Sequence, residues 1–158
     1  MEQDALQTPI CTPTYAVWLG GPDWRDPGWD AALYPADMPA DWRLSFYQSC
    51  WRCAWLDAAA WQSATMDTLQ SWAGEIEGGF RFILLGAGEM PPALAGCAFG
   101  PLAPDDARIV WLDEGTDLRA LSVRLQQATV EAPLFLLSRS AAVGRLERVE
   151  TLLELLGV

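Results

Sequence analysis

Acidic side chains are the main groups of this sequence that could perform acid–base chemistry. Asp57 follows a short apolar run that we expect to be a strand, and Asp113 and Glu114 follow another. Two neighbouring carboxylates can hydrolyse a glycosidic bond when an apolar, tryptophan-rich environment keeps one of them protonated. The same residue types are also common in turns and at helix N-caps. Asp57, Asp113 and Glu114 are therefore candidate catalytic residues with an ordinary structural alternative.

Aromatic residues at regular spacing lie near the start of the chain. Trp24, Trp29 and Tyr34, which we call the aromatic ladder, are five residues apart in a stretch rich in Gly, Pro and Asp. This stretch follows the apolar run 15–20, a pattern typical of a loop after a buried strand. Rings beside a carboxylate such as Asp23 suit a sugar-like ligand. The alternative is a loop held against the sheet by its own aromatic side chains.

The residue types that are missing exclude several chemistries. The chain has no histidine, lysine or asparagine, so the usual general base, a Schiff base and a P-loop are all excluded. The net charge is −11 and the ten basic residues, all arginine, are scattered. Such a surface would repel nucleic acid and anionic membranes. No apolar run approaches the length of a membrane span, and no secretory signal is apparent, so we expect a cytoplasmic protein.

Four cysteines raise the question of redox or metal chemistry. Cys50 and Cys53 form a CxxC, but the pair ends an expected helix and enters a strand, whereas thioredoxin-like pairs open a helix. A zinc site would need Cys11 and Cys97 as further ligands, and their spacing is unrelated. We expect reduced, partly buried thiols, no metal and no cofactor.

Strands and helices are expected to alternate along one α/β domain. Apolar runs and helical periodicity predict strands at 15–20, 53–56, 80–85, 108–112 and 134–137, and helices at 41–49, 66–76, 117–128 and 143–156. This order favours a mostly parallel five-stranded sheet. Residues 1–14 are expected to be a flexible segment, and 86–106, rich in Gly, Pro and Ala, to be a bridge without regular structure.

Several short motifs resemble the YecE-like family, whose members have a TIM-type β/α barrel and no established reaction. The motifs are Gly21-Pro22-Asp23-Trp24, Trp29, Leu33-Tyr34-Pro35, Leu44-Ser45-Phe46-Tyr47, Leu69-Gln70-Ser71-Trp72-Ala73 and Gly79-Phe80-Arg81-Phe82. The resemblance covers roughly residues 15–85. Residues 109–115 and 134–157 are more weakly similar to the end of the barrel, which implies that the middle strands are lost and that 86–106 bridges the gap.

This resemblance implies an opened barrel with predicted strand order 4-5-1-2-3. Strands three and four would be apolar edges, and we expect the 86–106 segment, a second copy or another protein to cover them. The resemblance also implies that polar residues at the barrel mouth have been replaced, among them by Trp55, Asp57, Trp61, Trp111 and Asp113. The candidate ligand-binding residues are Asp23, Trp24, Trp29, Tyr34, Trp61 and Trp111.

Two functions therefore follow as hypotheses. The first is a non-catalytic interaction or ligand-binding domain derived from a YecE-like barrel, self-associating through its apolar edges as a homodimer. The second is a small carboxylate-dependent hydrolase acting on a carbohydrate-like substrate. The first is favoured, because nearly all polar residues expected at the barrel mouth are replaced while the aromatic framework is kept.

Overall fold

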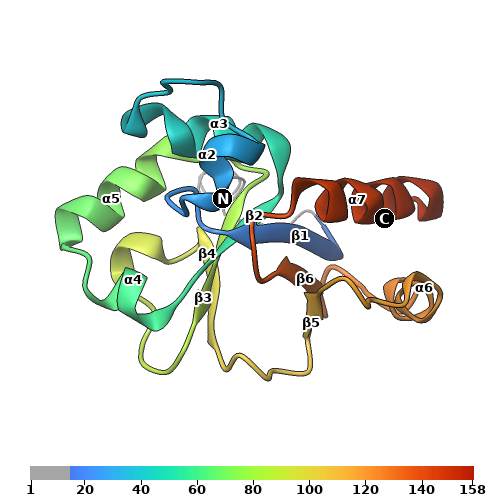
Figure 1. Cartoon of the computed structure of the whole chain (residues 1–158). Coiled ribbons are helices and arrows are strands. Elements are labelled where there is room, and N and C mark those ends of the chain that lie inside the picture. Colours follow the sequence, from blue (N-terminus) through green and yellow to red (C-terminus); the bar gives the residue numbers. More distant parts are fainter. Residues whose placement is uncertain (1–14) are drawn as a thin grey trace, which may run out of the picture.

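A curled sheet of six parallel strands forms the frame of the computed structural model, which describes residues 15–158. The predicted flexible segment 1–14 lies outside the described residues. The strand order is β4-β3-β2-β1-β6-β5. The strands are β1 (Val17–Pro22), β2 (Cys53–Leu56), β3 (Arg81–Leu85), β4 (Ala98–Leu102), β5 (Ile109–Leu112) and β6 (Leu134–Ser138). The sheet curls into a half-barrel that is open between β4 and β5 (Figure 1).

The α/β class and the parallel sheet were predicted correctly, but a sixth strand was not, and this strand makes the observed order differ from the predicted one. The segment 86–106 contains the short 3-10 helix η3 (Pro92–Leu94) and the additional strand β4, which pairs with β3. β3 is therefore an inner strand rather than the predicted edge. The other predicted strands keep their expected neighbours, because β5 pairs with β6, β6 with β1, β1 with β2 and β2 with β3.

Glycine and proline hid β4 from sequence analysis, because both are depleted in strands. Gly100 has a φ of +111°, and a Cβ atom there would lie 2.5 Å from the Leu84 carbonyl oxygen. Only glycine fits this close approach. Pro101 lacks an N–H group, which is tolerated because β4 has a neighbour on one side only.

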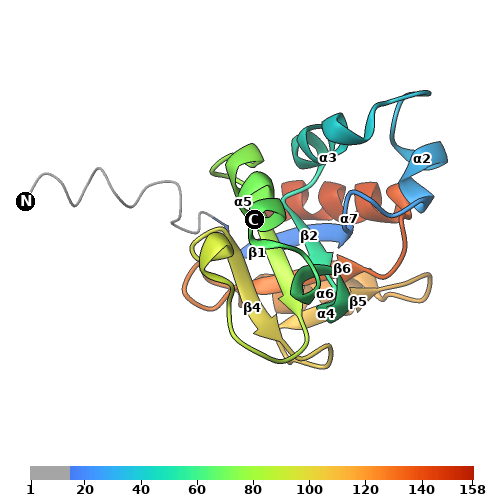
Figure 2. The same cartoon turned by 90° about the vertical axis from the view of Figure 1, so that its left-hand side faces the viewer.

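Helices cover the outer, convex side of the curled sheet (Figures 1 and 2). They are α2 (Gly28–Ala32), η2 (Ala40–Trp42), α3 (Arg43–Cys50), α4 (Ala58–Gln62), α5 (Met66–Glu75), α6 (Leu118–Leu125) and α7 (Val143–Leu156). Their apolar residues join alternate strand residues, such as Val17, Leu19 and Leu136, in one buried cluster. Four of these helices were predicted near their observed positions, and α7 ends as expected at Gly157, whose φ is +73°.

The concave side of the sheet holds a second, smaller cluster to which no described helix contributes. Trp18, Ile83 and Phe135 are fully buried there or nearly so, and Phe99, Trp55 and Trp111 pack against them. Ring centroids lie 5.3 Å apart for Trp18 and Phe99 and 5.0 Å apart for Phe99 and Phe135. Aromatic side chains thus fill the space that a barrel would enclose.

Gly20 sets how closely β1 and β2 approach each other. A Cβ atom at Gly20 would lie 1.8 Å from the Cys53 carbonyl oxygen, so the Gly20→Ala variant must move one strand. We expect it to lower the free energy of unfolding by about 3 kcal/mol, as overpacking does.

Urea unfolding measures this effect, with Gly74→Ala as the matched control. Nothing lies within 4 Å of a Cβ atom at Gly74, which is in α5. Alanine there should raise stability by roughly 0.5–1 kcal/mol. Equal stability of the two variants would contradict the assigned contact.

Candidate functional site

The aromatic ladder lies on the helix-covered side of the sheet, not inside the half-barrel. Trp24, Trp29 and Tyr34 are all buried in the outer cluster. Trp24 meets the ring of Trp72 in α5 edge to face at 5.1 Å, and Trp29 meets Tyr47 in α3 at 5.4 Å. The ladder therefore attaches the loop after β1 to the helices that follow it.

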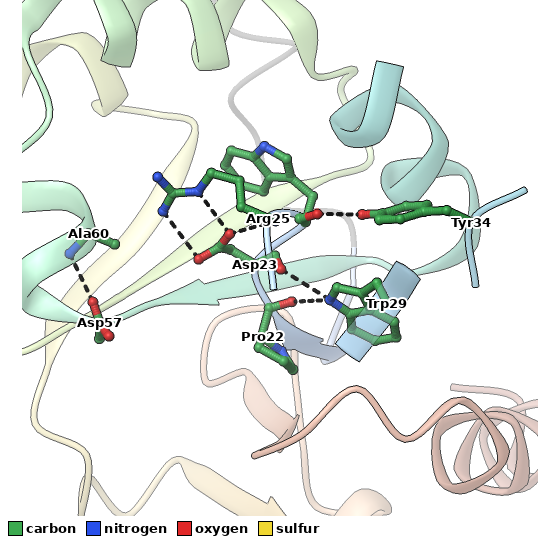
Figure 3. A network of polar contacts seen from close by, with 8 residues as sticks. Pro22, Asp23, Arg25, Trp29, Tyr34, Asp57 and Ala60 are labelled. Atoms are coloured by element: carbon green, nitrogen blue, oxygen red, sulfur yellow. Dashed lines mark hydrogen bonds and ion pairs between the residues drawn. The ribbon is translucent and has the colours of Figure 1, made fainter. Parts of the chain in front are cut away.

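The Trp29 indole and the Tyr34 hydroxyl donate hydrogen bonds to backbone carbonyl groups nearby in the chain (Figure 3). The Tyr34 hydroxyl donates to the Trp24 carbonyl at 2.6 Å, and the Trp29 indole N–H lies 3.1 and 3.0 Å from the carbonyls of Pro22 and Asp23. The Asp23 carboxylate accepts from the Arg25 side chain at 3.0 Å. The Trp29 indole and the Tyr34 hydroxyl therefore have hydrogen-bond partners inside the protein.

Tyr47 joins β1 to β2 through its hydroxyl group. The oxygen accepts from the Gly21 N–H at 3.0 Å, and the hydroxyl donates to the Cys53 carbonyl at 3.0 Å, with the Gly21 carbonyl at 3.2 Å. Tyr47 is fully buried, and this burial raises the pKa of its hydroxyl well above the usual value. The group therefore stays protonated and keeps donating at neutral pH.

The candidate catalytic carboxylates take part in local turns and caps. Asp57 accepts from the Ala60 N–H at 2.8 Å and caps α4, and Figure 3 shows it turned away from Asp23. Asp113 accepts from the Gly115 N–H at 2.8 Å. Glu114 extends into solvent, with its side chain 97% exposed. Asp113 and Glu114 lie together after β5, whereas Asp57 follows β2.

Trp61 and Trp111 occupy different surroundings. Trp61 is the buried residue of α4 and donates its indole N–H to the Leu85 carbonyl at 2.9 Å. Trp111 is on the concave side, 5.7 Å from the ring of Trp55, and the Arg139 guanidinium carbon lies 4.1 Å from its ring centroid. The sequence-predicted ligand residues are thus divided between two faces of the sheet.

The CxxC pair is poorly placed for thiol chemistry. Cys50 ends α3 and Cys53 begins β2, as predicted, and both thiols are free. Burial raises the pKa of Cys50 and, more strongly, that of Cys53, which is fully buried. Reactive cysteines have a lowered pKa instead.

Sequence reasoning missed two residues, Tyr47 and Arg145, whose side chains form hydrogen bonds to distant or buried strand residues. The role of Tyr47 depends on a hydrogen bond to a glycine 26 residues earlier, which periodicity does not reveal. Arg145 lies at the start of α7 beside Ser138. The sequence signal that could have drawn attention to it is the absence of an acidic residue from the first turn of that helix. Within residues 15–158, no group of three or more His, Cys, Asp or Glu could hold a metal ion.

The chain folds as an open α/β half-barrel, and aromatic side chains pack in its interior. Residues 18–90, just under half of the chain, match a family model described as protein of unknown function DUF72. This match confirms that this part of the chain resembles the YecE-like family. Neither the curated proteins nor the solved structures contain a match to the chain. In the described part of the chain, no helix is long and apolar enough to cross a membrane.

Replacing Tyr47 by phenylalanine tests the strand connection. The Gly21 N–H would lose the buried acceptor that Tyr47 provides, which costs about 1–3 kcal/mol of stability. Urea denaturation measures the loss. Tyr34→Phe, which removes a single hydrogen bond to Trp24, is the control and should cost about 1 kcal/mol. A Tyr47→Phe protein as stable as the wild type would show that the strands do not depend on this hydroxyl.

Proposed function

We propose that the chain is a non-catalytic interaction domain, derived from a YecE-like barrel, that pairs with a second copy through its open side. The observation that carries this proposal is the contact between Trp55 and Trp111 near the carboxyl ends of β2 and β5. In barrel enzymes the site lies at the carboxyl ends of the strands, above the barrel interior. Here Trp55 and Trp111 face each other in that region, and the Trp55 indole N–H donates to the Ser138 carbonyl at 2.8 Å.

The state of the carboxylates supports a non-catalytic role. Glycosidases need one carboxyl group kept protonated in an apolar environment beside a second carboxylate. Asp57 caps a helix, Asp113 holds a turn and Glu114 is in solvent. We therefore prefer an interaction domain to the carbohydrate hydrolase.

An apolar hollow on the open side offers a contact surface. A cavity of about 430 Å³ lies between β4 and the start of β6. Its apolar lining consists of Phe99, Leu102, Val130, Pro133 and Phe135. β4 and β5 are the two ends of the sheet, so each presents one unpaired edge. Apolar surface beside unpaired strand edges is the usual setting for strand pairing between chains.

A second copy suits this surface because its rim carries both signs of charge. Arg108 and Glu131 also line the hollow. A two-fold axis brings the same patch of both copies together, so a positive and a negative group can face each other across it. The net charge of −11 opposes association over longer distances, and salt should therefore strengthen the dimer.

Sedimentation velocity at micromolar concentration tests the dimer. We expect a dimer for the wild type and a monomer for Val130→Glu, because the carboxylate would be buried in the contact. Val130 is 41% exposed, so the variant should fold normally. Val123→Glu in α6 makes the same change at a residue that is 55% exposed and should remain dimeric. A monomeric wild type, or a dimeric Val130→Glu protein, would overturn the proposal.

A further inference from the structure

We propose that the open edge of β5, together with the neighbouring face of α6, binds an extended peptide that carries basic side chains. The peptide extends the sheet by one strand beyond β5. The cavity at this edge, which we call the edge groove, shares no lining residue with the hollow of the proposed dimer. The inference therefore does not rest on the proposed function.

The edge groove is a cavity of about 300 Å³ that follows the border of β5. Val110 and Trp111 both line it, although Val110 packs against the outer cluster and Trp111 against the concave one. Successive strand residues point to opposite faces, so a cavity that touches both must lie along the edge of the strand. No residue of the connection 103–108 lines the groove, and this connection therefore leaves the edge open there.

Backbone groups on this edge are available for pairing. The Arg108 carbonyl accepts from the Phe135 N–H, and alternate residues of a parallel strand bond to the same neighbour. Val110 and Leu112 therefore also bond to β6, and the backbone of Trp111 faces the open edge. In the described part of the chain, no strand pairs with β5 on that side. An added strand supplies partners for the Trp111 N–H and C=O groups.

One face of α6 forms the other wall of the edge groove. The residues of this wall have the spacing i, i+3, i+4 and i+7 of a single helical face, and they are Asp117, Ala120, Leu121 and Arg124. Ala120 is exposed and contributes only a methyl group, which leaves space beside the strand. In strand addition, main-chain hydrogen bonds provide affinity and pockets beside the edge receive alternate side chains. The space at Ala120 suits an apolar side chain of the peptide.

Acidic side chains at the carboxyl end of β5 specify a basic partner. Asp113 and Asp117 line the edge groove, and the side chain of Glu114 next to them is 97% exposed. Asp113 and Asp117 each use Oδ1 to accept from backbone N–H groups of their own turn or helix cap, at 2.8–3.2 Å. Within residues 15–158, Oδ2 of each has no hydrogen-bond partner. These two oxygens can accept from a lysine or arginine of the peptide.

Charge also favours a peptide over a second copy as the occupant of the edge groove. The net charge is −11, so a second copy would bring another acidic protein to an acidic groove. The basic residue among the lining residues, Arg124, already donates to the Ala107 carbonyl at 2.9 Å. A basic peptide is attracted instead, most strongly at low salt. The occupant is therefore an extended segment of another protein, with apolar residues flanked by Lys or Arg.

Fluorescence polarisation with a defined probe tests the edge groove. The probe is an end-blocked, fluorescein-labelled peptide of sequence Lys-Val-Thr-Val-Lys, whose valines and threonine favour an extended strand. Wild type and Val130→Glu should bind it alike, because the hollow and the groove share no residue. Added salt should weaken the binding, whereas it should strengthen the dimer.

Two altered probes separate charge from strand pairing. Glutamate in place of both lysines reverses the charge, and N-methylation of every residue removes the main-chain donors. Each altered probe should bind at least about tenfold more weakly than the lysine probe. Equal binding of either altered probe, or of both, would contradict the proposal.

A variant of the groove wall tests the location. Ala120→Leu fills the space beside β5 and should weaken binding of the lysine probe at least about tenfold. The variant should fold normally, because Ala120 is exposed and leucine is a good helix former. Ala59→Leu makes the same change at an exposed residue of α4 and should bind the probe as the wild type does. Unchanged affinity of Ala120→Leu would overturn the proposal.

Neutralising the two lining carboxylates tests the charge requirement. Asp113→Asn combined with Asp117→Asn should weaken probe binding roughly three- to tenfold at low salt. Asparagine keeps the turn and the helix cap, so folding is preserved. The matched control combines Asp57→Asn with Asp67→Asn, which removes two charges from α4 and α5 and should leave binding unchanged. Equal effects of the two double variants would show that only net charge matters, and the assigned site would be wrong.

Sedimentation velocity distinguishes the peptide from a second copy. The Ala120→Leu variant should have the same oligomeric state as the wild type, since the peptide groove lies outside the dimer contact. A wild-type dimer that becomes a monomer in Ala120→Leu would place a second copy in the groove and would overturn the inference.

Discussion

The junction between β1 and β2 is the contact on which the rest of the structure depends. Gly20 lets the two backbones approach, and the Tyr47 hydroxyl then bonds to both strands from α3. Gly21 leaves the space in which the Trp29 ring lies, since a Cβ atom there would be 2.9 Å from that ring. The spacing of β1 and β2, the attachment of α3 to them and the packing of Trp29 therefore depend on two glycines and one hydroxyl group.

Aromatic side chains pack on both faces of the sheet. The concave face is filled with aromatic rings, and the ladder that suggested a ligand platform serves the helix-covered core. Buried polar atoms without a partner in residues 15–158 are found on both sides of the sheet, among them Trp18 Nε1 on the concave face and Arg145 Nε in α7.

Much of the fold could be predicted from local patterns, because continuous apolar runs such as β3 and β6 and the periodicity of α7 each contain their own evidence. β4 could not, since its Gly100 and Pro101 are tolerated only at the edge of a sheet that the local sequence does not reveal. The surroundings of the candidate residues were also hidden. Whether Trp24 faces solvent or Trp72 depends on contacts between residues 48 positions apart.

The short connection between β4 and β5 has a consequence for how the chain can grow. Residues 103–108 join the two ends of the sheet directly, and they are held by hydrogen bonds from Trp111 to the Pro104 carbonyl and from Arg124 to the Ala107 carbonyl. No strand pair crosses this point. Whole strand–helix units could therefore be inserted there without breaking an existing ladder, each adding to a free edge. The half-barrel is in this sense a framework that can be extended between β4 and β5 toward a closed barrel.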